Sequence, residues 1–215
     1  MYRLHCLGQS GNSFKVAFML RALDQPFETV HVDFLNGATR EAGWRASTNE
    51  MGEAPVLEDG ERRLTQSGAI LTYLAEKHGR FGGASEQERH EILRWILFDN
   101  HKFTSYFATY RFAKSFGPSA PDLAVLAWLK TRIDAAYSVV DKHLETRDFM
   151  VGDGPTIADF SLCGYLFYPI EESGYDVEGA YPNIAAWAAR LRQLPGWAPP
   201  YDMMPGERVA PRWNV

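Results

Sequence analysis

The hydrophobic pattern changes its period near Gly79, and this change limits the folds open to the 215-residue chain. Before it, short apolar runs with β-branched residues ("YRLHCL", "FETVHVDF") flank one helical pattern ("SFKVAFMLRALD"). After it, apolar residues recur every three or four positions, as in amphipathic helices. The stretch "HGRFGGASEQ" separates the two regions. We therefore expect an α/β domain over 1–79, a linker over 80–85 and an all-helical domain over 86–215.

The α/β region contains two halves. The first is a βαβ unit, whose strands should be parallel with a right-handed crossover. The second begins with "APVLED" and "ERRLTQ", two short strand patterns joined by the hairpin signal Asp59-Gly60, and ends in a helix that we expect to start at Ser67. This βαβ-ββα order is the thioredoxin-like arrangement.

The helical region is predicted to hold four main segments. They are expected at about 86–116, at "DLAVLAWLKTRIDAAYSVVDKHLE", from "PTIADFSLCGYLF" and at "NIAAWAARLRQL". Thr156 and Asp159 resemble a capping box, which has a structural role. Four aromatic residues at helical spacing are expected to be mostly core, with one or two lining a cleft for an apolar substrate: Phe103, Tyr106, Phe107 and Tyr110.

Composition narrows the class of partner. The net charge of −5 is scattered along the chain, which argues against nucleic acid. No apolar run approaches the roughly 20 residues of a membrane helix, and no signal peptide opens the chain, so a cytoplasmic location is expected. Cys6 and Cys163 are far apart and the histidines form no ligand pattern, so neither a disulfide nor a metal site is expected. A small molecule is the expected partner.

Three polar features of the α/β region are candidates for binding that molecule. Pro55 precedes a strand; if its peptide bond is cis, the backbone of Ala54 is open to a peptide-like ligand, although a trans bond is commoner. Ser67 is expected to cap its helix, whose first N–H groups attract anions, and Gln66 offers an amide to an amino-acid head group. Ser10 and Asn12 lie in the turn after the first strand, which could also be only a loop.

These motifs together resemble those of a bacterial glutathione S-transferase of the cytosolic superfamily. The matching stretches are "SGNSFKV", "GEAPVL", "QSGAILTYL", "PTIADFSL" and "YPNIAAWAARLRQLPGW". The resemblance implies that glutathione is the co-substrate, that a hydrophobic electrophile is the second substrate, and that the chain forms a homodimer. It also implies that Gln66 and Ser67 hold the γ-glutamyl group and that the Ala54-Pro55 corner pairs with the cysteinyl unit.

The resemblance implies two candidates for the residue that faces the sulfur. Ser10 stands where serine-type transferases keep their catalytic serine, and Asn12 stands where members similar to the yeast prion-like transferases keep an asparagine. We favour Ser10, whose hydroxyl would stabilise the glutathione thiolate rather than attack. Glu53 occupies a position close to the glycyl carboxylate where Lys or Gln is common, and this departure leaves open a catalytically weak binding or scaffold protein as the alternative.

Overall fold

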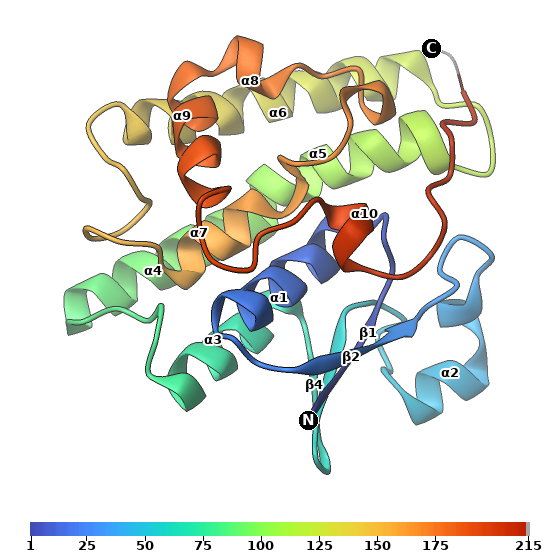
Figure 1. The fold of residues 1–215 in the computed structure, drawn as a ribbon. Coiled ribbons are helices and arrows are strands. Elements are labelled where there is room, and N and C mark those ends of the chain that lie inside the picture. Colours follow the sequence, from blue (N-terminus) through green and yellow to red (C-terminus); the bar gives the residue numbers. More distant parts are fainter. Residues whose placement is uncertain (214–215) are drawn as a thin grey trace.

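The computed structural model describes residues 1–213. Its sheet has four strands in the order β2-β1-β3-β4, with β1 parallel to β2 and antiparallel to β3, and β3 antiparallel to β4. The predicted βαβ-ββα arrangement is therefore confirmed (Figure 1). The strands are β1 (Tyr2–Cys6), β2 (Phe27–His31), β3 (Val56–Asp59) and β4 (Arg62–Thr65).

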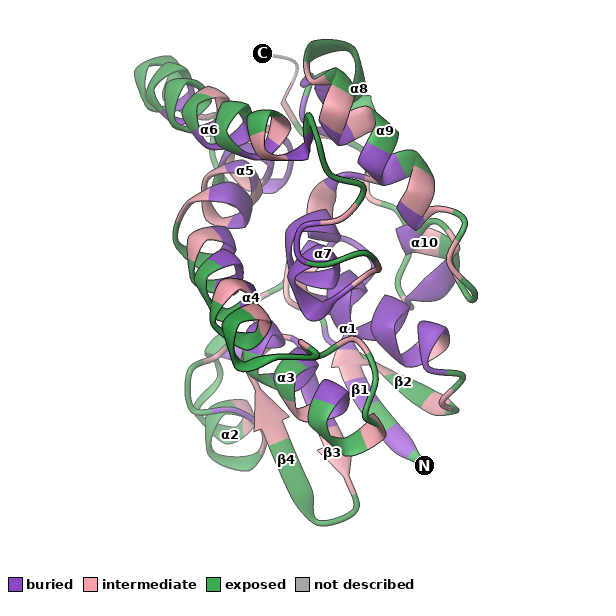
Figure 2. Cartoon of the chain, turned by 90° about the vertical axis from the view of Figure 1, so that its left-hand side faces the viewer, coloured by how far each residue is buried: buried purple, intermediate pink, exposed green. Residues whose placement is uncertain are grey.

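Helix α1 (Gly11–Ala22) lies between the sheet and the helical region. It packs on α3 (Ser67–His78) of the α/β region and on α7 (Ile157–Leu162) of the helical region. Because neighbours surround it, α1 is buried on nearly all sides (Figure 2). Phe14 and Phe18 have no solvent exposure.

The helix expected over 86–116 is a continuous helical segment with one π-helical turn in its middle and a second at its end. Its parts are α4 (Glu86–Phe98), a π turn at Asp99–Phe103, α5 (Thr104–Arg111) and a second π turn at Phe112–Phe116. Helix α6 (Leu123–Leu144) packs on α5 and forms the outer side of the helical region (Figure 1). The shorter helices that complete this region are α8 (Val177–Ala180), α9 (Pro182–Leu191) and α10 (Pro200–Met203), with 3₁₀ turns at Cys163–Tyr165 and Ile170–Glu172.

The predicted capping box begins α7. The Thr156 side chain accepts a hydrogen bond from a backbone N–H of the first turn, and the Asp159 carboxylate accepts from the Thr156 N–H at 2.8 Å. Asp159 also accepts from the Trp187 indole at 2.8 Å. The motif therefore joins α7 to α9 as well as starting a helix.

A buried ion pair joins the two regions. Lys15 of α1 and Asp99 of the first π turn are both fully buried, with 2.7 Å between Nζ and Oδ2. Ser161 of α7 donates to the same carboxylate oxygen at 2.7 Å. Beside this pair, the backbone of α1 approaches the 3₁₀ turn at Cys163–Tyr165 so closely that position 11 must be glycine. A Cβ at Gly11 would collide with Tyr165 and with the carbonyl of Gly164.

The connection between the regions begins at Gly79, which ends α3 in the left-handed conformation, and α4 begins after its N-cap Ser85. Residues 214–215 of the expected helical domain lie outside the described residues.

Two local features of the α/β region differ from the sequence-based expectation. Strand β2 is shorter than the pattern "FETVHVDF", and the stretch after it forms a 3₁₀ turn (Ala38–Arg40) and α2 (Ala42–Ser47), which buries no side chain and so carries no apolar period. Over residues 1–213, no helix is long and apolar enough to cross a membrane.

Candidate functional site

A cavity of about 550 Å³ lies between the two regions, within the size range of small-molecule sites. Five residues predicted from the sequence lie on its wall: Ser10, Asn12, Glu53, Ala54 and Gln66. The opposite wall comes mainly from α5 and from the π turns on either side of it. Its remaining lining residues are Leu7, Gln9, Phe34, Leu35, Asn100, Ser105, Ala108, Thr109, Arg111, Phe112, Phe116 and Tyr165.

Ser10 is the N-cap of α1. Its Oγ atom accepts a hydrogen bond of 3.1 Å from the Ser13 N–H, and its carbonyl accepts from the Phe14 N–H. A hydroxyl can donate while it accepts. Capping therefore fixes the oxygen and leaves the proton free for an acceptor in the cavity, at the positive end of the α1 dipole.

Asn12 and Ser67 join the N-termini of α1 and α3. The Ser67 hydroxyl donates to Oδ1 of Asn12 across 3.4 Å, a long hydrogen bond. The Asn12 oxygen is thus engaged, while its NH₂ group remains a possible donor on the cavity wall. Ser67 itself is buried beside the cavity rather than on its wall.

The prediction that Ser67 caps α3 is wrong by one residue. Gln66 is the N-cap: its carbonyl accepts the first helical hydrogen bond, from the Ile70 N–H, and its own side chain makes no capping bond. Gln66 has φ of +65°, an uncommon conformation for a residue with a side chain. This backbone turns the Gln66 side chain to the cavity and leaves Ser67 as the first helical residue.

Glu53 and Ala54 form the neighbouring part of the wall. The Gln66 amide donates to the Glu53 carboxylate at 2.8 Å, so the acidic residue that departs from the family pattern contacts the amide expected to bind ligand. The Ala54-Pro55 peptide bond is cis. Ala54 lines the cavity, and Pro55 is buried behind it, immediately before β3.

The four aromatic residues are expected from the sequence to be mostly core, with one or two lining a cleft; three are buried, and none of the four lines the cavity. Phe103 and Phe107 stack on Tyr137 of α6, with ring centroids 4.1 and 5.9 Å apart, and Tyr110 is buried against Tyr175. Tyr106 faces Trp128. The helical face that carries these aromatic residues packs on α6. Ala108 and Phe112 line the cavity instead, and Phe112 contacts Phe34 with ring centroids 6.3 Å apart.

Two of the described residues on the cavity wall are charged, Glu53 and Arg111. Arg111 is 3% exposed and pairs with the fully buried Glu172, with 3.0 Å between Nε and Oε2. Burial alone would lower the pKa of Arg111, but Tyr168 and Glu172 together raise it, so the residue is a permanent cation. Burial raises the pKa of Tyr165, with Arg111 opposing, so that side chain stays a hydroxyl. The sequence around Arg111 does not indicate that this residue lines the cavity or pairs with an acid, because Glu172 is 61 positions away.

The cysteines lie away from this chemistry. Both are buried, and burial raises the pKa of the Cys6 thiol to about 12. Among residues 1–213, no group of three or more His, Cys, Asp or Glu side chains could hold a metal ion.

The fold and the site can be compared with known proteins. Residues 3–76 match the family model of the glutathione S-transferase N-terminal domain, and residues 103–195 match that of the C-terminal domain. Mouse glutathione S-transferase theta-2 is 32% identical over 181 residues, covering 80% of this chain and 72% of the relative. Glutathione S-transferase F14 of Arabidopsis thaliana is 27% identical over 205 residues, covering 91% and 80%.

Solved structures agree with these matches. The crystal structure of a possible glutathione S-transferase from Rhodopseudomonas palustris superimposes with a TM-score of 0.85, at 32% identity, covering 97% of this chain and 93% of that one. The chain therefore belongs to the glutathione S-transferase family. It is an enzyme, a transferase that uses glutathione.

Proposed function

We propose that the cavity holds glutathione in an extended conformation with its sulfur at Ser10. In this arrangement the γ-glutamyl group lies at Gln66 and the N-terminus of α3, and the cysteinyl unit pairs with the backbone of Ala54. The observation that supports it best is the convergence of Ser10, Ala54 and Gln66 on one cavity wall. These residues come from three separate segments, so their meeting is a property of the fold.

The proposed reaction is addition of the glutathione thiolate to a hydrophobic electrophile. A thiol with a pKa of about 8.5 is only a few per cent ionised at pH 7. One hydrogen bond to a charged acceptor is worth about 1.5–3 kcal/mol, which corresponds to one or two pKa units. Donation by Ser10 would therefore raise the thiolate fraction at pH 7 by about eightfold to 25-fold. Glutathione-dependent reduction of a disulfide or peroxide would use the same thiolate.

The proposed electrophile site is the aromatic end of the cavity, around Phe34, Phe112 and Phe116. We assign the electrophile to these residues rather than to Phe103, Tyr106, Phe107 and Tyr110, because none of those four lines the cavity. In this division, residues 1–79 bind glutathione, 80–85 link the regions, and the helical domain from residue 86 supplies most of the apolar surface. A cytoplasmic location is proposed with it, since glutathione is abundant there.

We also propose a homodimer in which the α/β region of one subunit contacts the helical domain of the other, at the outer face of α4 and α6. Leu93 and Leu97 of α4 and Trp128 of α6 are each more than half exposed. Figure 2 shows exposed residues along both helices. A second, mostly apolar cavity of about 610 Å³ adjoins this face between α3 and α4. Apolar surface of this kind is typical of subunit interfaces. Sedimentation of the parent and of Leu97→Asp tests the dimer, since a charge at this face should shift the parent from dimer to monomer.

The alternative function is a binding or scaffold protein with little catalysis. Glu53 favours it, because a carboxylate on the cavity wall opposes an anionic ligand. Retention on immobilised glutathione followed by a conjugation assay with an activated aromatic halide separates the two. Retention with conjugation supports the enzyme, and retention without turnover of several electrophiles, disulfides and peroxides supports the binding protein.

A further inference from the structure

The loop that precedes Ser10 is held by residues from distant parts of the chain. The Gly8 N–H donates to the Pro205 carbonyl at 2.8 Å, and the Gly8 carbonyl accepts from the Tyr168 hydroxyl at 2.7 Å. The Gln9 amide donates to the carbonyl of Glu207 at 2.7 Å. The segment after α10 therefore packs on this loop, and Figure 1 shows it running from α10 past the β1–α1 connection toward the end of α5.

Arg111 contacts the peptide group that precedes Ser10. Its Nη1 donates to the Gln9 carbonyl at 2.7 Å, and that carbonyl belongs to the peptide group that ends at the nitrogen of Ser10. On the other side, the Ser10 oxygen is fixed by the first turn of α1. The Ser10 N–H also donates to the Leu7 carbonyl at 3.1 Å. Arg111 is thus one of three holds on Ser10, beside the Leu7 carbonyl and the first turn of α1.

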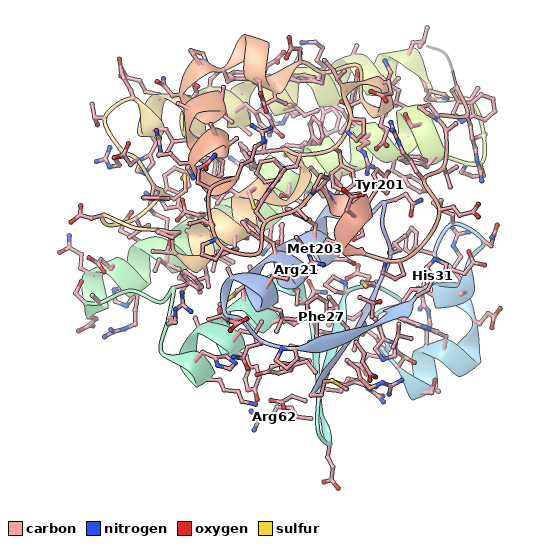
Figure 3. The ribbon with its side chains drawn as sticks, in the orientation of Figure 1. Arg21, Phe27, His31, Arg62, Tyr201 and Met203 are labelled. Atoms are coloured by element: carbon pink, nitrogen blue, oxygen red, sulfur yellow. The ribbon has the colours of Figure 1, made fainter. Side chains whose placement is uncertain are left out.

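Glu172 in turn holds Arg111. Its carboxylate is completely buried and accepts from Nε and Nη2 of Arg111, from the Tyr201 hydroxyl at 2.9 Å and from Nε of Arg208 at 3.2 Å. The Arg111 guanidinium also lies 4.1 Å from the ring centroid of Tyr168. Figure 3 shows Tyr201 on α10, on the α1 side of the sheet, together with Met203 and Arg21. A buried arginine with this many partners has a single orientation.

We propose that Arg111 is a positioning residue for the Ser10 hydroxyl, held in place by Glu172. The proposal rests on the proposed role of Ser10. The direct Coulomb effect of Arg111 on the thiolate is small because the negative charge of Glu172 compensates the positive charge of Arg111. Arg111 therefore acts through the Gln9-Ser10 peptide. Loss of Arg111 leaves the Gln9 carbonyl without this donor while Gly8 stays bonded to Pro205 and Tyr168. The Gln9-Ser10 peptide can then tilt, and the hydroxyl no longer points consistently at the sulfur.

A double-mutant cycle tests this mechanism. The pKa of enzyme-bound glutathione is measured by thiolate absorbance in the parent, Arg111→Met, Ser10→Gly and the double variant, with conjugation rates alongside. In the presence of Ser10, Arg111→Met should raise the thiol pKa and lower the rate about tenfold, with glutathione affinity changed less than about threefold. In the Ser10→Gly background, Arg111→Met should change the thiol pKa by less than about 0.3 units and the conjugation rate by less than about twofold.

Three outcomes overturn the proposal. An equal effect of Arg111→Met in both backgrounds means that Arg111 acts on the thiolate directly. No effect of Arg111→Met in the parent means that the contact does not position Ser10. No effect of Ser10→Gly in a protein that does conjugate glutathione removes the role through which Arg111 would act, whereas absence of conjugation by the parent is the separate failure of the proposed function.

Two further variants guard against loss of structure. Trp187→Phe removes a buried hydrogen bond to Asp159 far from the cavity and should lower the melting temperature without changing the thiol pKa. If Arg111→Met does not fold, Glu172→Gln keeps the size of the side chain and weakens its hold on Arg111. It should raise the thiol pKa when Ser10 is present and leave it unchanged in Ser10→Gly; an equal shift in both overturns the proposal.

Discussion

The side chains of Gln66 and Glu53 are joined by a hydrogen bond of 2.8 Å from Nε2 to Oε2. The amide proposed to hold the γ-glutamyl group is therefore already bonded to a carboxylate on the same wall. Both side chains are exposed, so the bond can open when a ligand binds. Opening it would leave the negative charge of Glu53 beside an anionic ligand.

Glu53→Gln is expected to strengthen glutathione binding. Removal of an exposed like charge is worth about 0.2–1 kcal/mol, which corresponds to an increase in affinity of up to about fivefold. Calorimetric titration measures it, with Glu50→Gln as the control, because Glu50 is an exposed acid of the same segment that does not line the cavity. Weaker binding by the glutamine variant would mean that Glu53 contacts the ligand's ammonium group.

The position of Ser67 within α3 gives a prediction about stability. A helix interior favours alanine over glycine by about 0.5–1 kcal/mol, whereas an N-cap favours glycine over alanine. Because Gln66 is the cap, Ser67→Gly should be less stable than Ser67→Ala. At Ser85, which caps α4 and accepts from the Glu88 N–H at 3.1 Å, the order should reverse. Denaturant unfolding of the four variants measures both orders, and the same order at both sites would contradict the assignment of the cap.

The capping box shows why some features could be predicted from sequence. Thr156 and Asp159 act within one helical turn, so their spacing is sufficient to indicate the motif. The βαβ-ββα order likewise follows from local periods and one hairpin signal. By contrast, the positive φ of Gln66 has no sequence signal, so the sequence pattern predicts the cap one residue late.

The apolar end of the cavity is a part of the site that the sequence did not predict. The spacing of Phe103, Phe107 and Tyr110 correctly indicated one face of a helix, but the partner of that face is α6. Which face meets the cavity depends on which face packs on α6, and the local pattern does not encode that choice. The pair of Arg111 and Glu172 escapes prediction because its partners meet only in the folded chain.

Both cysteines are expected to be unreactive in the native protein. Cys6 and Cys163 are buried, and burial raises the pKa of the Cys6 thiol to about 12, far above neutral pH. A chromogenic disulfide reagent at pH 8 should therefore modify neither thiol until a denaturant is added, and then modify both. Rapid modification of the folded protein, together with loss of conjugation, would indicate chemistry by the enzyme's own thiol.

The ion pair between Lys15 and Asp99 is expected to stabilise the junction between the regions. Lys15→Met leaves a buried carboxylate without its cation, which costs about 3–5 kcal/mol in the free energy of unfolding. Lys130→Met removes an exposed pair with Asp134 on α6 and should cost less than about 1 kcal/mol. Equal losses in denaturant unfolding would show that the junction does not depend on this pair.

The pKa of the bound glutathione thiol tests the central claim most directly. It is measured by thiolate absorbance against pH in the parent, Ser10→Gly and Asn12→Ala; glycine is chosen because it remains an acceptable N-cap for α1. We predict a bound pKa about one to two units below the free value of about 8.5 in the parent and in Asn12→Ala, and a rise of at least one unit in Ser10→Gly. A rise in Asn12→Ala with no change in Ser10→Gly would contradict the account and assign the thiolate to Asn12.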